Sequence, residues 1–168
     1  FDDLKGMKIR APEIEGVIAG LKQVGAKPTV IPFNELYGAL QQGVVDGMAT
    51  LGNLMISQKF YEVTNYCYQN DWGIGLDKQM INVNAWDGMS KEQQSILVDT
   101  FNELEPQDFF RATADAESTN FAKWREINGA DSTPMLDASA AQRTLKPAIK
   151  DLTDDIFGAG TYDKIQSA

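Results

Sequence analysis

Residues 7–31 read MKIRAPEIEGVIAGLKQVGAKPTVI, a segment that predicts a strand, a helix and a second strand in succession. Met7 to Ala11 alternates apolar and basic side chains, which is typical of a half-buried strand, and the proline that follows ends it. From residue 14 to residue 24 the apolar positions follow the period of an amphipathic helix, and Gly25 ends that helix in the C′ position. Thr29 to Ile31 then reads as a short strand.

The alternation of strands and helices continues after residue 31. Asn34 is a plausible N-cap for a second helix, which Gly43 ends, and Val44 to Thr50 reads as a third strand. Strands that alternate with helices imply a sheet with parallel pairs and crossover connections. We therefore predict an α/β fold.

Beyond residue 75 helices dominate the pattern. Strands are predicted only at 79–83 and, more weakly, at 129–135. We expect three parts: strand-helix repeats over residues 1–75, a returning strand and a long kinked helix over 76–130, and a C-terminal strand with helices over 131–168.

The helices of the second half carry clear boundary signals. Ser90 and Gln93 form a capping box before a long helix, and Pro106 should kink or break that helix because it lacks a donor. Asp137 is expected to cap the last major helix, and Gly158 is expected to end it.

Composition excludes several classes of function. Fifteen basic and twenty-four acidic residues give a net charge of −9, which disfavours nucleic acids and anionic membrane surfaces as partners. The sequence has no histidine, so Ser-His-Asp and Cys-His pairs and the usual zinc ligands are absent. The single cysteine, Cys67, lies between aromatic residues and reads as a structural thiol. We expect no catalytic residues, no metal and no cofactor, and hence a protein that is not an enzyme.

Arg10 is the strongest candidate for a binding residue. It lies at the carboxyl end of the first predicted strand, where open α/β sheets bind their ligands. Its planar guanidinium matches a carboxylate bidentately, which a lysine cannot do. The alternative is an arginine that lies in solvent at a strand end.

Other side chains have both a binding and a structural interpretation. Phe33 and Tyr37 are either walls of a ligand pocket or core residues, and Glu35 either orients Arg10 or is solvated at the helix start. Trp72, in a glycine-containing loop, is either a lid over a ligand or a packing residue.

Five blocks of the sequence resemble the solute-binding subunits of TRAP transporters, the DctP-like family. They are DLKGMKIR at 3–10, GAKPT at 25–29, PFNELYGALQQGVVDG at 32–47, QKFYEV at 58–63 and NAWD at 84–87. The resemblance extends over nearly the whole chain and corresponds to the C-terminal half of family members, which are about twice as long.

The resemblance implies a periplasmic-binding-protein-like (type II-like) fold of two α/β lobes, of which this chain is mainly the second lobe with the returning strand and C-terminal helices. It implies an extracytoplasmic protein that captures a small organic anion and delivers it to a membrane permease. We expect it in the periplasm, although the chain itself begins without a signal-peptide pattern.

The resemblance also implies roles for individual residues. Arg10 falls on the family's carboxylate-binding arginine, Phe33 on its pocket phenylalanine, and Glu35 and Tyr37 on its helix glutamate and tyrosine. Thr50 stands where the family usually has an asparagine that touches the ligand, and a hydroxyl is shorter than an amide.

In the expected site Arg10 binds a carboxylate of the ligand, Phe33 and Trp72 shield that carboxylate from water, and Thr50 hydrogen-bonds the distal end of the ligand. The alternative is a structural or self-associating module, because unpaired strand edges favour pairing with another chain.

Overall fold

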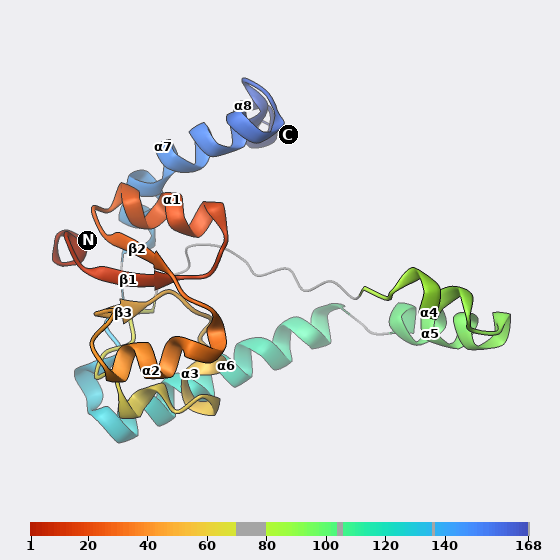
Figure 1. Ribbon diagram of the computed structural model, residues 1–168, viewed down its shortest axis with the longest axis horizontal. Coiled ribbons are helices and arrows are strands. Elements are labelled where there is room, and N and C mark those ends of the chain that lie inside the picture. The colour runs from red at the N-terminus through yellow and green to blue at the C-terminus, as the bar shows by residue number, and fades with distance from the viewer. Residues whose placement is uncertain (70–79, 104–105, 136, 168) are drawn as a thin grey trace. The chain divides into compact units, whose positions relative to one another are not determined.

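A computed structural model describes residues 1–69, 80–103, 106–135 and 137–167 (Figure 1). Its contacts divide the chain into two compact units. Unit 1 comprises Phe1–Trp72 and Asn120–Ala168, and unit 2 comprises Gly73–Thr119. The division into residues 1–75, 76–130 and 131–168 that the sequence suggested stays a prediction.

Unit 1 is built on a parallel sheet. The strands are β1 (Lys8–Ala11), β2 (Lys27–Val30) and β3 (Gly47–Met48), in the order β2-β1-β3. Both pairs are parallel, with Arg10 level with Thr29 on one side and with Met48 on the other. The predicted strand-helix-strand-helix-strand order is confirmed, and the fold class is α/β.

The third strand is shorter than predicted. Only two residues of the predicted strand at 44–50 pair with β1. The backbone N–H of Val44 turns back to the carbonyl of Ala39, and the side chain of Asp46 accepts the N–H of Lys8 at 2.8 Å. That carboxylate therefore satisfies a backbone donor at the start of β1 that a longer β3 would otherwise have met.

Helices and 3-10 turns surround the sheet of unit 1. The 3-10 turns are η1 (Asp2–Leu4), η2 (Phe33–Glu35), η3 (Phe60–Glu62) and η4 (Ala130–Ser132). The helices are α1 (Glu15–Gln23), α2 (Leu36–Gln41), α3 (Leu54–Ser57), α7 (Ala138–Phe157) and α8 (Thr161–Gln166), together with the end of α6 (Pro106–Asn128). In Figure 1, α1 and α7 lie to one side of the sheet and α2 and α3 to the other.

Two clusters of buried side chains hold these layers together. The cluster under α1 and α7 consists of Ile9, Ala11, Leu21, Val24, Ala26 and Leu145. The cluster under α2 and α3 consists of Leu36, Leu40, Val45, Met55, Phe60, Phe121 and Trp124. Because both faces of β1 are covered, its residues from Ile9 onward are all buried, including Arg10.

The predicted cap of the second helix is wrong. Asn34 lies inside the 3-10 turn η2, and Glu35 occupies the N-cap position of α2 without a side-chain cap bond. The backbone N–H of Glu35 already bonds the carbonyl of Pro32 at 3.1 Å, so the chain enters α2 through a tighter turn.

Two further strand predictions are wrong. Residues 80–82 of the predicted returning strand are not extended pairs, and a helix begins at Val83 because Asn82 caps it, its side chain accepting the N–H of Asn84 at 2.9 Å. In the predicted C-terminal strand, Ser132 closes a turn by donating its hydroxyl to the carbonyl of Gly129. Met135 forms an isolated bridge with Gln69, and the carbonyls of Ser132 and Pro134 accept the N–H groups of Cys67 and Gln69.

Unit 2 consists of helices: α4 (Val83–Asp87), α5 (Lys91–Glu103) and the first part of α6. The predicted capping box is confirmed, since the Ser90 hydroxyl accepts the N–H of Gln93 at 3.2 Å and the Gln93 amide accepts the N–H of Ser90 at 2.9 Å. The predicted break falls at residues 104–105, outside the described residues; the described part of α5 ends at Glu103 and that of α6 begins at Pro106. Within the described residues, no helix combines the length and apolarity needed to cross a membrane.

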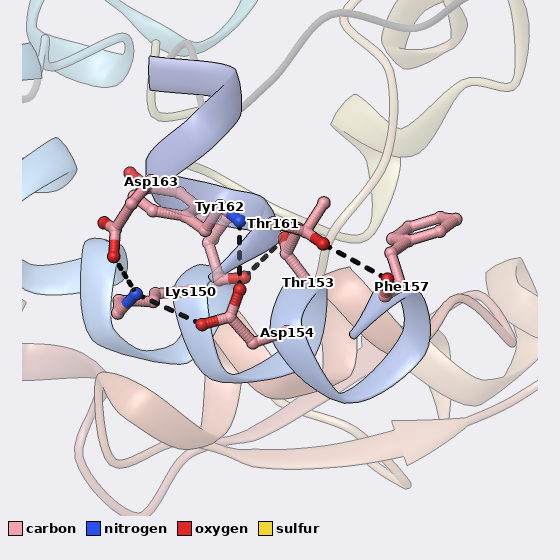
Figure 2. A network of polar contacts seen from close by, with 8 residues as sticks. Lys150, Thr153, Asp154, Phe157, Thr161, Tyr162 and Asp163 are labelled. Carbon is pink, nitrogen blue, oxygen red and sulfur yellow. Dashed lines mark hydrogen bonds and ion pairs between the residues drawn. The ribbon is translucent and has the colours of Figure 1, made fainter. Parts of the chain in front are cut away.

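A polar network closes the C-terminal end of unit 1 (Figure 2). Asp137 caps α7 as predicted, and Gly158, at φ +98°, ends it. Lys150 pairs with Asp154 at 3.1 Å and with Asp163 at 2.6 Å, and Asp154 accepts the backbone N–H of Tyr162 at 2.9 Å. These contacts fix α8 against the last turns of α7.

Candidate functional site

Arg10 lies at the point where the three strands end. Its Nε donates a hydrogen bond to the carbonyl of Ile31 at 2.9 Å, and its Nη1 donates to the carbonyl of Ala49 at 3.4 Å. Ile31 directly follows β2 and Ala49 directly follows β3, so one guanidinium spans the carboxyl edge of the sheet. Ligands of open α/β sheets bind at this edge.

Arg10 is a buried cation, not an arginine in solvent. Only 5% of its surface is exposed, and burial lowers the pKa of the guanidinium. Its carbonyl partners are neutral, and no carboxylate among the described residues forms an ion pair with it. A guanidinium stays charged in proteins, so the edge of the sheet carries positive charge that these contacts do not neutralise.

Phe33 lies beside this charge. Its ring centroid is 5.9 Å from the Arg10 Cζ, within the range of a cation–π contact. The same ring meets the buried Phe60 edge to face, at 6.3 Å between centroids, yet Phe33 keeps 41% of its surface exposed. The side chain therefore has both a packing contact and a free apolar surface next to Arg10.

Tyr37 and Glu35 have different surroundings from Arg10. Tyr37 is half-buried against the cluster under α2 and α3, and its hydroxyl donates to the Glu62 carboxylate at 2.6 Å. That hydrogen bond raises the pKa of Tyr37. Glu35 is exposed, and within the described part of the chain no hydrogen bond or ion pair joins it to Arg10.

Thr50 follows Ala49, the residue whose carbonyl accepts Arg10 Nη1, and its side chain is exposed. Trp72 lies outside the described residues. The structure thus brings Arg10 and Phe33 into contact and places Thr50 one residue away along the chain from a partner of Arg10.

Sequence reasoning did not identify the groups that hold Arg10. Both are backbone carbonyls, and a carbonyl has no residue signature. The only available signal was position, because Ile31 and Ala49 each lie at the end of a predicted strand.

Two hollows of the described surface lie away from Arg10. One, of about 340 Å³, is lined by Ile81, Val83 and Trp86 in unit 2. The other, of about 600 Å³, runs between α1 and α7. Arg10 lines neither of them. Within the described residues, no group of three or more acidic, cysteine or histidine side chains is placed to hold a metal ion.

The model of bacterial extracellular solute-binding protein, family 7 (DctP), matches residues 1–155. The chain belongs to this family. The predicted resemblance to TRAP solute-binding subunits is therefore confirmed.

Curated relatives are similar over part of their length. The C4-dicarboxylate-binding periplasmic protein DctP of Vibrio cholerae is 30% identical over 146 residues, which are 86% of this chain and 40% of that protein. The 2,3-diketo-L-gulonate-binding periplasmic protein YiaO of Escherichia coli is 35% identical over 101 residues, 60% of this chain and 31% of that protein.

Solved structures agree on the fold. A TRAP periplasmic solute-binding protein from Desulfovibrio salexigens, with bound orotic acid, superimposes with a TM-score of 0.78 and 28% identity over 98% of this chain and 53% of that chain. One from Shewanella oneidensis, with bound succinate, gives a TM-score of 0.73 at 22% identity over 91% of this chain and 50% of that chain. The chain spans two fifths or less of these two curated relatives and about half of these solved chains.

Proposed function

We propose that this chain forms the second lobe of an extracytoplasmic solute-binding protein that captures a small organic anion for a TRAP-type membrane permease. The protein binds a carboxylate and releases it unchanged, so it is not an enzyme. Its place of action is the periplasm, as the names of the relatives indicate for those proteins.

One observation carries the proposal: a buried guanidinium at the carboxyl edge of the sheet, bonded only to neutral carbonyls among the described residues. Burying an unpaired charge costs free energy, and a carboxylate ligand would offset that cost with a charge-assisted bond. The bound molecules of the neighbours, orotic acid and succinate, are both organic acids.

The remaining site residues have supporting roles in this proposal. Phe33 covers one side of the ligand with its exposed ring surface, and Trp72 shields another side. The Thr50 hydroxyl bonds the distal end of the ligand, and Glu35 and Tyr37 line the approach from the start of α2. Closure of the partner lobe excludes water.

A hybrid protein tests the proposal. In it, this chain replaces the matching 53% of the Desulfovibrio salexigens protein, so that the remaining part of that protein provides the other lobe. Native mass spectrometry and thermal unfolding are measured with orotic acid, succinate and their uncharged amides. We expect at least one acid, and neither amide, to bind and to raise the unfolding temperature.

The Arg10→Lys variant of the hybrid should lose about 2–5 kcal/mol of binding free energy, because the remaining ammonium cannot form the planar fork. Lys8→Met, on the exposed face of the same strand, is the matched control and should leave binding unchanged. Equal stabilisation of Arg10→Lys and the parent hybrid by the acid would refute the role of Arg10.

The alternative function, a self-associating module, makes a different prediction about size. Light scattering of the 168-residue chain alone should report a dimer or larger species if exposed strand edges pair. A monomer at all concentrations counts against this alternative.

A further inference from the structure

Asn128 and Gly129 form the only Asn-Gly pair of the sequence. Such a pair is prone to deamidation, because glycine has no side chain to keep its backbone nitrogen away from the asparagine amide. The Gly129 nitrogen attacks Cγ of Asn128 and forms an N–Cγ bond, while the Cγ–Nδ2 bond breaks. The leaving nitrogen takes up the proton that Gly129 loses and departs as ammonia. Water then opens the five-membered imide at either carbonyl and yields aspartate or isoaspartate.

The folded chain places this pair at the end of α6, within unit 1. Asn128 is the last residue of the helix, and Gly129 adopts φ +98°, a conformation that favours glycine. The Gly129 N–H donates to the carbonyl of Arg125 at 2.9 Å. A nitrogen whose N–H is held in this way does not lose its proton to solvent, so the closed helix end blocks the attack on Asn128.

The turn η4 that follows holds Gly129 from the other side. The Gly129 carbonyl accepts the N–H of Ser132 at 3.1 Å and the hydroxyl of Ser132 at 2.6 Å. Ser132 is only 3% exposed, and its own carbonyl accepts the N–H of Cys67 at 2.8 Å. The peptide bond between Asn128 and Gly129 is therefore fixed at both ends while α6 and η4 stay closed.

The end of α6 also contains two buried donors. Trp124 Nε1 and Asn128 Nδ2, one helical turn apart, find no hydrogen-bond acceptor in the part of the chain that the structure describes. A buried donor without an acceptor costs free energy, which is recovered when water reaches it. Opening of the last turn exposes Asn128 Nδ2 to water and frees the Gly129 N–H at the same time. One local motion therefore releases both the leaving group and the attacking nitrogen.

We propose that Asn128–Gly129 is a deamidation site that the folded end of α6 keeps closed, and that opening of this helix end sets the rate of the modification. Loss of ammonia makes the change irreversible. Isoaspartate adds one carbon to the main chain between residues 128 and 129, and this displaces the turn η4 that holds the N–H of Cys67. The modification thus marks chains whose helix end has opened. It concerns unit 1 alone and is independent of the role of Arg10.

Peptide mass spectrometry of the 168-residue chain tests the site. The chain is incubated at neutral pH, folded and in guanidinium chloride, and deamidation is followed at every asparagine. In denaturant Asn128 should react fastest. In the folded chain it should react at least about tenfold more slowly, which corresponds to an opening free energy of about 1.4 kcal/mol or more. A faster asparagine elsewhere in denaturant, or equal rates at Asn128 in the two states, would overturn the proposal.

Hydrogen exchange measures the opening itself. The Gly129 amide exchanges when its bond to the Arg125 carbonyl opens, so its protection factor should match, within about threefold, the ratio of the denatured to the folded deamidation rate at Asn128. Protected amides in β1 show in the same experiment that unit 1 is folded. Folded deamidation far slower than this protection factor predicts would show that another element closes the site, and the proposal would be wrong.

Ser132→Ala loosens the site without changing the reacting atoms. It removes the 2.6 Å hydrogen bond to the Gly129 carbonyl, so Gly129 exchange and Asn128 deamidation in the folded chain should both become faster, by the same factor. The rate in denaturant should stay unchanged. Ser57→Ala is the matched control, because it removes a hydroxyl that bonds backbone carbonyls in α3, and it should change neither rate. Faster Gly129 exchange without faster deamidation in Ser132→Ala would contradict the proposal.

Discussion

The two units of this chain contain similar helix-boundary residues but differ in how many apolar side chains they bury. In unit 1 the helix caps and glycine stops surround a parallel sheet with two buried clusters. In unit 2 side chains cap the starts of α4 and α5, but the described apolar side chains stay at least partly exposed. The comparison teaches that local signals fix where a helix begins, whereas burial fixes whether the helix is stable.

The difference also explains where the candidate site lies. A buried, unneutralised guanidinium is costly, so only a rigid surrounding structure can hold it in place. Arg10 lies on the central strand of unit 1, covered on both faces and bonded to carbonyls on both neighbouring strand ends. Unit 2 has no comparable framework among its described residues.

The largest expected effect separates the buried core of unit 1 from the exposed helices of unit 2. Phe60→Ala should lower the free energy of unfolding of the chain by about 3–5 kcal/mol, because Phe60 is only 2% exposed inside the cluster under α2 and α3. Phe101→Ala, the same change at an α5 residue that is 46% exposed, should alter it by less than about 0.5 kcal/mol. Denaturant unfolding followed by circular dichroism measures both.

Similar losses for the two phenylalanine variants would show that unit 2 is part of one cooperative core with unit 1. The difference between the units would then lie in exposure alone and not in stability.

Sequence reasoning succeeded for features set by local pattern. The three strands and two helices of residues 7–50 alternate in period, and each strand borders a glycine or proline, so the parallel sheet could be predicted. Gly25, Ser90, Asp137 and Gly158 ended or capped helices as expected, since each acts within one turn of the chain.

Features decided by contacts between distant residues could not be predicted. The short apolar run near Ile81 fits a strand or a helix start equally well, and Asn82 decided it for the helix. The position of Arg10 at a strand end was predictable, but its burial depends on α2, α1 and α7 packing over both faces of the sheet. Its partners are backbone carbonyls 21 and 39 residues away in sequence, and the residue type does not show which backbone carbonyl will accept a hydrogen bond.

A smaller effect compares the caps of the two units. Asp137→Ala removes the acceptor for the N–H of Ser139 and should cost about 1 kcal/mol of global stability, because α7 belongs to the core of unit 1. Ser90→Ala removes an equivalent acceptor in unit 2. It should speed exchange in the first turn of α5 while leaving the global unfolding midpoint unchanged.

The informative result is a lower global unfolding midpoint in Asp137→Ala together with faster exchange, but an unchanged midpoint, in Ser90→Ala. If Ser90→Ala lowers the global midpoint as much as Asp137→Ala does, α5 unfolds together with the sheet. Denaturant melts and amide exchange on the same samples distinguish these outcomes.

The smallest effect concerns the surface network at the end of α7 (Figure 2). The N–H of Tyr162 is the main cause that holds the pKa of Asp154 below its ordinary value of 3.8; burial opposes it, and Lys150 and the backbone of Gly160 add smaller lowering effects. Asp163 first and then Asp154 raise the pKa of Lys150 above 10.5. Carbon-detected titration of the Asp154 carboxyl in Lys150→Met should therefore show a pKa that rises only part of the way, because the Tyr162 N–H remains.

The directions of the Asp154 and Lys150 pKa shifts set the pH range in which this network stabilises the fold. A lowered carboxyl pKa in the folded state stabilises the fold above about pH 3.8, and the gain is lost as the pH falls through the lowered pKa. A raised lysine pKa stabilises below about pH 10.5, and the gain is lost as the pH rises through the raised pKa. Lys150→Met should thus flatten the alkaline decline of the unfolding midpoint and weaken the acid decline. An Asp154 pKa that returns fully to its ordinary value would show that Lys150, and not the backbone donor, holds the end of α7 together.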